Sequence, residues 1–197
     1  MGNKSKRRRN RPAFKMQRSV AVLGMRGVGK STVCSKLAGL WQAKLVSVDD
    51  EIVKSKGKTI DKVVKEFGWP YFREEEYSVL QQVVANKEIV LLDPGGGILE
   101  TSDGKISKEK IDILKENFFI LYMTMEQHLL KERVESLREV KNRPALPGKP
   151  GFAELYQRRH EANKNTADAI VDISYLTPAE SAERIHQLIY GKILKTV

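Results

Sequence analysis

A glycine-rich stretch carries the most specific chemistry in the chain. Residues 24–31 read Gly-Met-Arg-Gly-Val-Gly-Lys-Ser and fit Gly-x-x-x-x-Gly-Lys-Ser/Thr, the pattern of loops that wrap nucleotide phosphates. Because glycine lacks Cβ, such a loop can turn successive N–H groups onto phosphate oxygens. Lys30 would then reach the β- and γ-phosphates, and the Ser31 hydroxyl would ligate Mg²⁺. The nucleotide-binding residues that this pattern predicts are Gly27, Gly29, Lys30, Ser31 and Thr32.

The segments on either side decide whether this loop binds phosphates or is only a flexible linker. The apolar run 19–23 has the length of a β-strand, and residues 32–40 have the pattern of an amphipathic helix. A phosphate loop requires this strand–loop–helix order, and the amino end of the helix adds a dipole that favours anions. The context therefore favours nucleotide binding.

Carboxylates follow two further apolar runs, where strands are expected to end. The run 44–48 leads into three acids that start at Asp49, and the run 89–92 leads into Asp93. Ligands of open α/β sheets bind outside the carboxyl ends of the strands, so these acids are candidates for the site. The three acids could instead cap the helix that follows them. Asp93 fits the loose Walker B pattern, in which the acid supports Mg²⁺.

Two more features suggest a second substrate that carries a negative charge. Gly95, Gly96 and Gly97 follow one strand closely; such a run could be a flexible turn, but here it favours a backbone that a substrate approaches. Arg73 precedes three acids at the start of an expected helix, where a cation is electrostatically unfavourable. An anionic substrate would explain that cation.

A basic segment interrupted by proline and glycine covers about residues 138–151. It cannot form regular structure, so it is either a plain surface loop or a mobile lid over phosphates, and we expect a lid. The helix after it contains Arg159 and His160. We interpret His160 as a solvated neighbour of this segment and not as a catalytic base.

The elements that must position these residues alternate between strand and helix. We expect strands at 19–23, 44–48, 89–93, 118–122 and 169–173. Alternation of this kind predicts an α/β fold with a five-stranded parallel sheet flanked by helices, together with a helical substrate-binding region. Fold alone does not identify the acceptor substrate.

The composition of the chain indicates its cellular compartment and its possible binding partners. The net charge is +10, but residues 1–18 hold eight basic residues and no acid. We therefore expect a disordered basic tail over 1–16, able to touch nucleic acid only nonspecifically, and a single domain over 17–197. The single cysteine, Cys34, indicates a reducing compartment, and neither a membrane span nor a signal peptide is expected. We expect a cytoplasmic monomer.

Taken in sequence order, the loop, the acids at 49–51, Phe72-Arg73, the three glycines, Arg143-Pro144 and Arg159 resemble the shikimate kinases over about residues 19–190. The resemblance implies a P-loop kinase fold and ATP-dependent phosphorylation of the 3-hydroxyl of shikimate with Mg²⁺. This reaction belongs to aromatic amino acid biosynthesis.

The resemblance also implies roles for individual residues. Asp49 is similar to the acid that holds the acceptor hydroxyls, and Arg73 and Arg159 are similar to the arginines that bind the substrate carboxylate. Two guanidiniums can fork onto one carboxylate, which agrees with this assignment. The three glycines would contact the substrate ring through their backbone.

Further roles implied by the resemblance concern the nucleotide. Arg143 is similar to the lid arginine that closes over the transferred phosphate, where a guanidinium stabilises charge in the transition state. Arg138, or alternatively Arg133, would lie against adenine. The expected catalytic residues are Lys30, Asp49 and Arg143.

Three positions depart from the family pattern. Ser47 stands where the family usually has an Asp, Asp93 stands where it has a neutral residue, and Asn163 stands where it often has an aromatic residue. Serine cannot supply the missing charge. We therefore hypothesise that Asp93 restores a carboxylate near Mg²⁺ from the adjacent strand, so that Ser31 and Asp93 hold the metal.

Two other functions stay open on these residues alone. The chain could be a P-loop kinase for a different small hydroxylated acid, which the change at Ser47 allows. It could also be an ATP-binding regulatory or nucleic-acid-associated protein that has lost catalysis. The intact Lys30, Asp49 and Arg73 argue against the latter.

Overall fold

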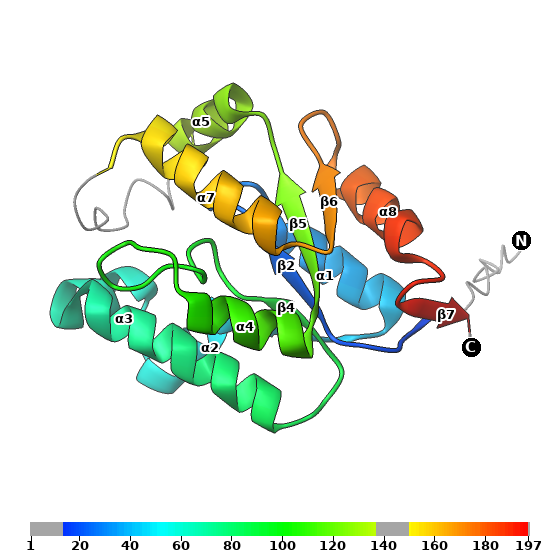
Figure 1. The fold of residues 1–197 in the computed structure, drawn as a ribbon, viewed down its shortest axis with the longest axis horizontal. Coiled ribbons are helices and arrows are strands. Elements are labelled where there is room, and N and C mark those ends of the chain that lie inside the picture. The colour runs from blue at the N-terminus through cyan, green and yellow to red at the C-terminus, as the bar shows by residue number, and fades with distance from the viewer. Residues whose placement is uncertain (1–13, 137–149, 197) are drawn as a thin grey trace, which may run out of the picture.

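The centre of the fold is a parallel five-stranded sheet with the strand order β3-β4-β2-β5-β6 (Figure 1). A computed structural model describes residues 14–136 and 150–196. The strands are β1 (Phe14–Met16), β2 (Val20–Leu23), β3 (Lys44–Ser47), β4 (Val90–Asp93), β5 (Phe119–Thr124), β6 (Ala169–Asp172) and β7 (Leu194–Thr196). The helices are α1 (Lys30–Trp41), α2 (Val48–Lys56), α3 (Ile60–Ala85), α4 (Lys108–Asn117), α5 (Gln127–Ser136), α7 (Phe152–Thr166) and α8 (Pro178–Ile189). The predicted α/β class and all five predicted strands are confirmed.

Both faces of the sheet are buried at its central strands β4, β2 and β5, which is why these strands read as apolar runs. Along β2, Val20 and Val22 belong to one hydrophobic cluster, whereas Ala21 and Leu23 belong to another. The first cluster includes the apolar faces of α1 and α8, and the second includes those of α3 and α4. These helices therefore cover opposite faces of the sheet (Figure 1).

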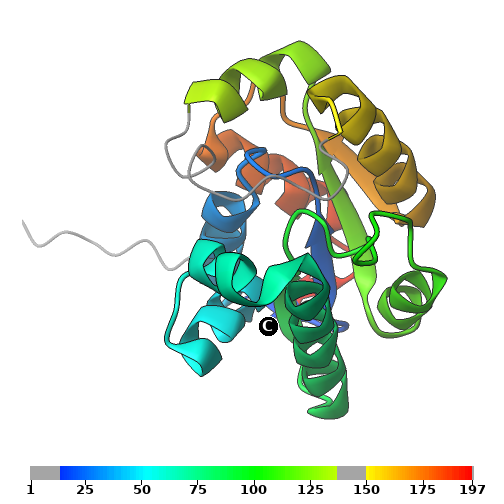
Figure 2. The ribbon, with the colours of Figure 1, turned by 90° about the vertical axis from the view of Figure 1, so that its left-hand side faces the viewer.

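The strand order reverses at the central strand β2, because the strands that follow it in sequence are added first on one side and then on the other. Strands β4 and β3 lie on one side of β2, and β5 and β6 lie on the other. Crevices at such a point, outside the carboxyl ends of the strands, are where open α/β sheets bind ligands. In Figure 2, α5 and α7 lie above this end of the sheet, and α2 and α3 lie below it.

Helix α3 is bent where its sequence contains glycine and proline. Gly68 has a φ of 84° and a ψ of 170°, which are not helical angles, and Pro70 follows in the first turn after the bend. The bend starts a new helical segment shortly before Arg73. This explains how a cation comes to lie near a helix start.

The two ends of the described chain pair with each other, which the sequence analysis did not predict. Strand β1 pairs antiparallel with β7 in a separate two-stranded sheet, and Met16 is buried. The ring of Phe14 packs edge-on against His186 and Tyr190. The domain therefore includes Phe14–Met16, and the boundary that we placed at Gln17 was wrong. Most of the expected tail over 1–16 and of the expected lid over about 138–151 lies outside the described residues.

Among the residues that the structure describes, no helix combines the length and the apolar character of a membrane span.

Candidate active site

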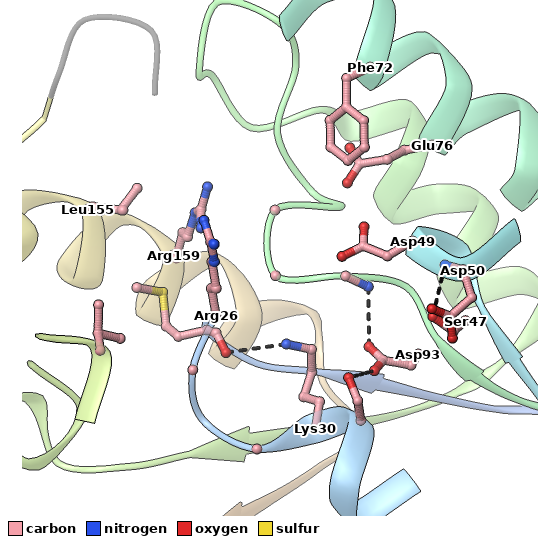
Figure 3. Close-up of a pocket in the computed structure, with 18 of the residues that line it drawn as sticks. Arg26, Lys30, Ser47, Asp49, Asp50, Phe72, Glu76, Asp93, Leu155 and Arg159 are labelled. Carbon is pink, nitrogen blue, oxygen red and sulfur yellow. Dashed lines mark hydrogen bonds between the residues drawn. The ribbon is translucent and has the colours of Figure 1, made fainter. Parts of the chain in front are cut away.

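A cavity of about 570 Å³ lies where the sequence analysis places the site, beside the carboxyl ends of β2, β3 and β4 (Figure 3). Predicted residues from distant parts of the chain line it together. These are Gly27, Gly29, Lys30, Ser31, Thr32, Asp49, Arg73, Asp93, Gly95, Gly96, Gly97 and Arg159. Two predicted residues, Arg138 and Arg143, lie outside the described part of the chain.

The phosphate loop has the backbone that its glycines were expected to allow. Gly27 and Gly29 have φ values of 84° and 102°, in the region that residues with a Cβ rarely adopt. Gly29 also forms the N-cap of α1, so the amino end of this helix faces the cavity. The Lys30 ammonium donates hydrogen bonds to the carbonyl oxygens of Gly24 at 2.9 Å and Met25 at 3.2 Å. The loop thus holds a cation at the helix end that favours anions.

Arg133 from α5 adds a cation to this loop. A Cβ placed on Gly29 would lie 3.3 Å from its guanidinium nitrogen Nη2, and Arg133 lines the cavity. Arg138, or alternatively Arg133, was expected to lie against adenine. Of the two, Arg133 lies in the described structure, beside the phosphate loop.

Ser31 and Asp93 meet through a direct hydrogen bond. The Ser31 hydroxyl donates to Asp93 Oδ2 at 2.8 Å, and the Gly95 N–H donates to Asp93 Oδ1 at 3.3 Å. The Asp93 side chain is buried beside the start of α1. In the β3–β4 pair, Asp93 is the direct partner of Ser47. A carboxylate that is missing on β3 is therefore present on β4 at the same level of the sheet.

This pair of oxygen groups fits Mg²⁺, which prefers carboxylate, hydroxyl and phosphate oxygens. The described residues contain no cluster of three His, Cys, Asp or Glu side chains arranged for a metal. A Mg²⁺ ion here would therefore depend on phosphate oxygens of a nucleotide for further ligands, as is usual for this metal.

The cap of α2 is Ser47 and not one of the acids that follow it. Its side chain accepts a hydrogen bond from the backbone N–H of Asp50 at 3.2 Å. Asp49 is consequently not needed as a cap, and its carboxylate lines the cavity close to Gly95, where an added Cβ would lie 3.6 Å from Oδ1. The alternative reading of these acids as the capping group is therefore wrong.

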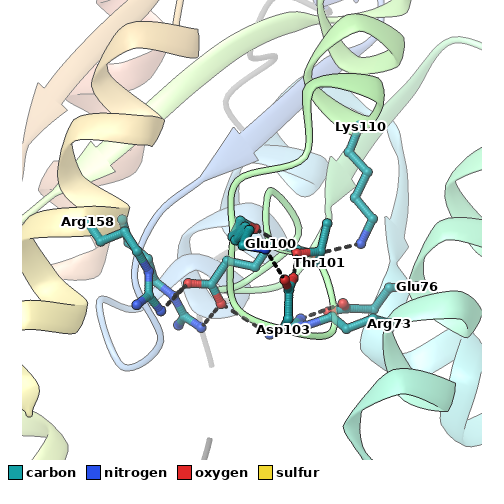
Figure 4. Close-up of polar contacts among 9 residues, drawn as sticks. Arg73, Glu76, Glu100, Thr101, Asp103, Lys110 and Arg158 are labelled. Atoms are coloured by element: carbon teal, nitrogen blue, oxygen red, sulfur yellow. Dashed lines mark hydrogen bonds and ion pairs between the residues drawn. The ribbon is translucent and has the colours of Figure 1, made fainter. Parts of the chain in front are cut away.

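Arg73 and Arg159 come together in the cavity wall, although they belong to different helices. Both side chains are buried, and both donate hydrogen bonds to the carboxylate of Glu100 (Figure 4). Arg73 also donates to Glu76 at 2.5 Å. Two guanidiniums that share one counter-ion are close enough to share an anionic ligand, as their predicted roles require.

Gly97 makes room for this pair. A Cβ on this residue would lie 2.5 Å from Nη2 of Arg73 and 3.0 Å from Nη2 of Arg159. A Cβ on Gly96 would lie 2.8 Å from the backbone nitrogen of Arg26. We predicted that a substrate needs these glycines; the structure shows that packing of the site itself also favours glycine at positions 96 and 97.

The carboxylates of this cluster were not among the predicted site residues. Glu76 lies one helical turn after Arg73, a spacing that could have indicated the ion pair. Glu100 lies in an irregular segment and has no such signal. Burial raises the pKa of Glu76 although Arg73 opposes this. Burial also acts to raise the pKa of Glu100, but hydrogen bonds and charge from Arg159 and Arg158 lower it overall.

His160 and Cys34 do not contribute to the cavity. His160 Nδ1 lies 2.9 Å from the Tyr122 hydroxyl, and its ring stacks on Tyr156. It is therefore packed among aromatic rings and not solvated as predicted, but the prediction that it is no catalytic base agrees with its place outside the cavity lining. Cys34 is buried, and desolvation raises the pKa of its thiol, which suits a packing role.

Comparison with known proteins agrees with this geometry. The family model "Shikimate kinase" matches residues 26–190. The chain is 32% identical to a shikimate kinase of Leptospira biflexa over 172 residues, which are 85% of this chain and 93% of that protein. It is 30% identical to a shikimate kinase 2 of an Enterobacter species, over 86% of this chain and 94% of that protein.

Solved structures give the same result. A shikimate kinase from Acinetobacter baumannii in complex with shikimate superposes with a TM-score of 0.75 at 25% identity, covering 88% of this chain and 93% of that one. A shikimate kinase from Aquifex aeolicus superposes with a TM-score of 0.69 at 25% identity, over 88% of this chain and 96% of that one. The chain belongs to the shikimate kinase family.

Proposed function

We propose that this protein transfers the γ-phosphoryl group of ATP to the 3-hydroxyl of shikimate. The observation that carries the proposal is one cavity that contains both a phosphate loop and a pair of buried arginines. The first suits a nucleotide, and the second suits a small carboxylate. The Acinetobacter relative, which was solved with shikimate, supports this acceptor.

In this proposal the loop binds the nucleotide. The backbone N–H groups around Gly27 and Gly29 face the phosphates, and Lys30 leaves its carbonyl partners to reach the β- and γ-phosphates. Exchange of neutral partners for an anion favours this movement, since charge-assisted hydrogen bonds are the stronger ones. Contacts of Arg138 with adenine and of Arg143 with the transferred phosphate remain predictions.

Ser31 and Asp93 would hold Mg²⁺. When bound, this ion neutralises charge that builds up on the phosphate oxygens during transfer. The Ser31 hydroxyl donates its proton to Asp93, so the lone pairs of its oxygen would be available to the ion. Asp93 thereby takes the part that an aspartate at position 47 would have played.

The acceptor half of the site would orient shikimate and take up its proton. Arg73 and Arg159 hold the carboxylate, and the backbone of Gly95–Gly97 lies along the ring. Asp49 accepts a hydrogen bond from the reacting hydroxyl and thereby holds this hydroxyl in line with the γ-phosphate. The Asp49 carboxylate then receives the proton of the hydroxyl. That the protein acts as a cytoplasmic monomer also remains a prediction.

Initial rates of ADP formation test the proposal. We expect a Mg²⁺-dependent rate that appears only with shikimate, and a kcat/KM at least tenfold lower for the methyl ester of shikimate, because the ester has no carboxylate for the arginine pair. An ADP release that is indifferent to shikimate would refute the proposal. A faster rate with another hydroxylated acid would reassign the acceptor.

A further inference from the structure

Glu100 is the least expected residue near the site, since it is a buried carboxylate outside any helix or strand. Its backbone is fixed at both ends. The Glu100 N–H donates to the carbonyl oxygen of Gly97 at 2.9 Å, and its own carbonyl oxygen accepts from Lys110 Nζ at 2.9 Å. An isolated β-bridge to Ile106 holds the same residue from a third side. The carboxylate is therefore presented from a fixed point.

The Glu100 carboxylate joins arginines from two helices (Figure 4). It accepts from Nε of Arg159 at 2.9 Å and from Nη2 of Arg159 at 2.5 Å. Arg158 Nη2 donates to it at 3.0 Å, and Arg73 Nη2 lies 3.4 Å away. Buried guanidiniums repel one another, so a shared carboxylate both offsets the repulsion and fixes the plane of Arg159 through two parallel bonds.

This carboxylate lies behind the arginines as seen from the cavity. Arg73, Arg159 and Gly97 line the cavity, whereas Glu100 and Arg158 do not. Glu100 uses one edge of the Arg159 guanidinium and leaves N–H groups on its other edge for a ligand. The third arginine, Arg158, adds positive charge to that of the cavity pair, so the cluster can still attract an anion.

We infer that Glu100 is a positioning residue for the acceptor: it holds Arg73 and Arg159 so that both face one substrate carboxylate. The inference rests on the proposed function, because it assigns Glu100 to the acceptor half of that reaction. It predicts an effect on acceptor binding that leaves the nucleotide half unchanged.

Glu100→Gln tests this inference, since it keeps the shape of the side chain and removes its charge. We expect the KM for shikimate to rise about tenfold or more, which corresponds to the loss of a hydrogen bond to a charged group. The KM for ATP should stay within twofold and kcat within threefold. Glu75→Gln is the matched control. Glu75 lies on α3, the helix of Arg73, but it pairs with Lys56 of α2 and does not line the cavity. This substitution should change none of these constants.

Arg158→Gln provides a second route, because it removes one partner of the Glu100 carboxylate and leaves Glu100 itself in place. Arg158 does not line the cavity and contacts Glu100. A rise in the KM for shikimate in this variant would therefore be an indirect effect, transmitted by Glu100 to the cavity arginines. We expect a smaller rise than in Glu100→Gln. Should Glu100→Gln not fold, this variant decides the question alone.

The possible failures are distinguishable. A wild-type enzyme without shikimate-dependent turnover refutes the proposed function and this inference with it. If the wild type turns over shikimate but neither variant raises its KM, only the inference fails. A lower KM in Glu100→Gln would also overturn it, since Glu100 would then compete with the substrate for the arginines.

Discussion

At the scale of single residues, the hydrogen bond between Ser31 and Asp93 has the most direct consequence. Asp93 lies opposite Ser47 in the β3–β4 register, so one position can substitute for the other. We predict that Asp93→Asn lowers kcat at least tenfold and raises the Mg²⁺ concentration needed for half-maximal rate, because the hydroxyl loses its anionic partner. Initial rates over a Mg²⁺ titration measure both effects.

The same pair offers a rescue experiment. Ser47→Asp keeps a good N-cap for α2, since Asp caps as well as Ser. The double variant Ser47→Asp/Asp93→Asn should therefore recover much of the rate and of the Mg²⁺ affinity. Unchanged Mg²⁺ dependence and turnover in Asp93→Asn would show that Asp93 has no part in metal binding.

Glu100 gives a prediction for pH-dependent stability. The pKa of Glu100 is lowered in the folded protein below the ordinary value of 4.5. The ionised carboxylate therefore stabilises the fold above pH 4.5, and this contribution is lost as the pH falls through the pKa of the folded state. Wild type should exceed Glu100→Gln by roughly 3 kcal/mol in free energy of unfolding at neutral pH. The difference should shrink below about pH 4.5. Urea unfolding at several pH values measures it, and a difference independent of pH would contradict the assignment.

At the scale of elements, the bend in α3 is the feature that places Arg73. Gly68 has a positive φ and Gly39 lies inside α1, so the two glycines form a matched pair. Gly68→Ala should lower the free energy of unfolding by about 1 kcal/mol and raise the KM for shikimate, because a Cβ strains that backbone. Gly39→Ala should raise stability by about 0.5 kcal/mol, since no atom lies within 4 Å of the added Cβ.

Thermal or urea unfolding together with the KM for shikimate checks this pair. Equal effects of the two substitutions on stability would mean that the backbone conformation at position 68 does not disfavour a residue with a Cβ.

Elements and motifs with local signals were predicted well, and residues whose role arises from tertiary contact were not. The strand before the phosphate loop and the helix after it were both identified, because each depends on neighbours in sequence. Glu100 was missed, since its three arginine partners come from α3 and α7. Ser47 was judged only by the charge it lacks, and its capping role appeared only in the structure.

At the scale of the whole molecule, β1 and β7 join the two ends of the domain away from the cavity. Their pairing could not be predicted, because a three-residue strand has no periodicity and its partner lies at the opposite end of the chain. A basic run before Phe14 also disguised the apolar positions of β1.

This pairing predicts different results for two truncations. A variant that begins at Gln17 lacks β1 and should lose about 2 kcal/mol of unfolding free energy, the value of burying a side chain such as Met16. A variant that begins at residue 12 keeps β1 and should match the full chain. Both should retain the kcat of the full chain, because no residue of β1 lines the cavity. Equal stability of the two truncations would contradict a structural role for β1.

In the proposed function, one cavity brings the γ-phosphate of ATP to the 3-hydroxyl of shikimate. The most direct measurement is a proton–phosphorus correlation spectrum of the product formed from ATP, Mg²⁺ and shikimate. We predict a phosphate monoester whose phosphorus couples to the proton on C3. A phosphorus coupled to a proton on another carbon, or the absence of any phosphate ester while ATP is consumed, would contradict the account.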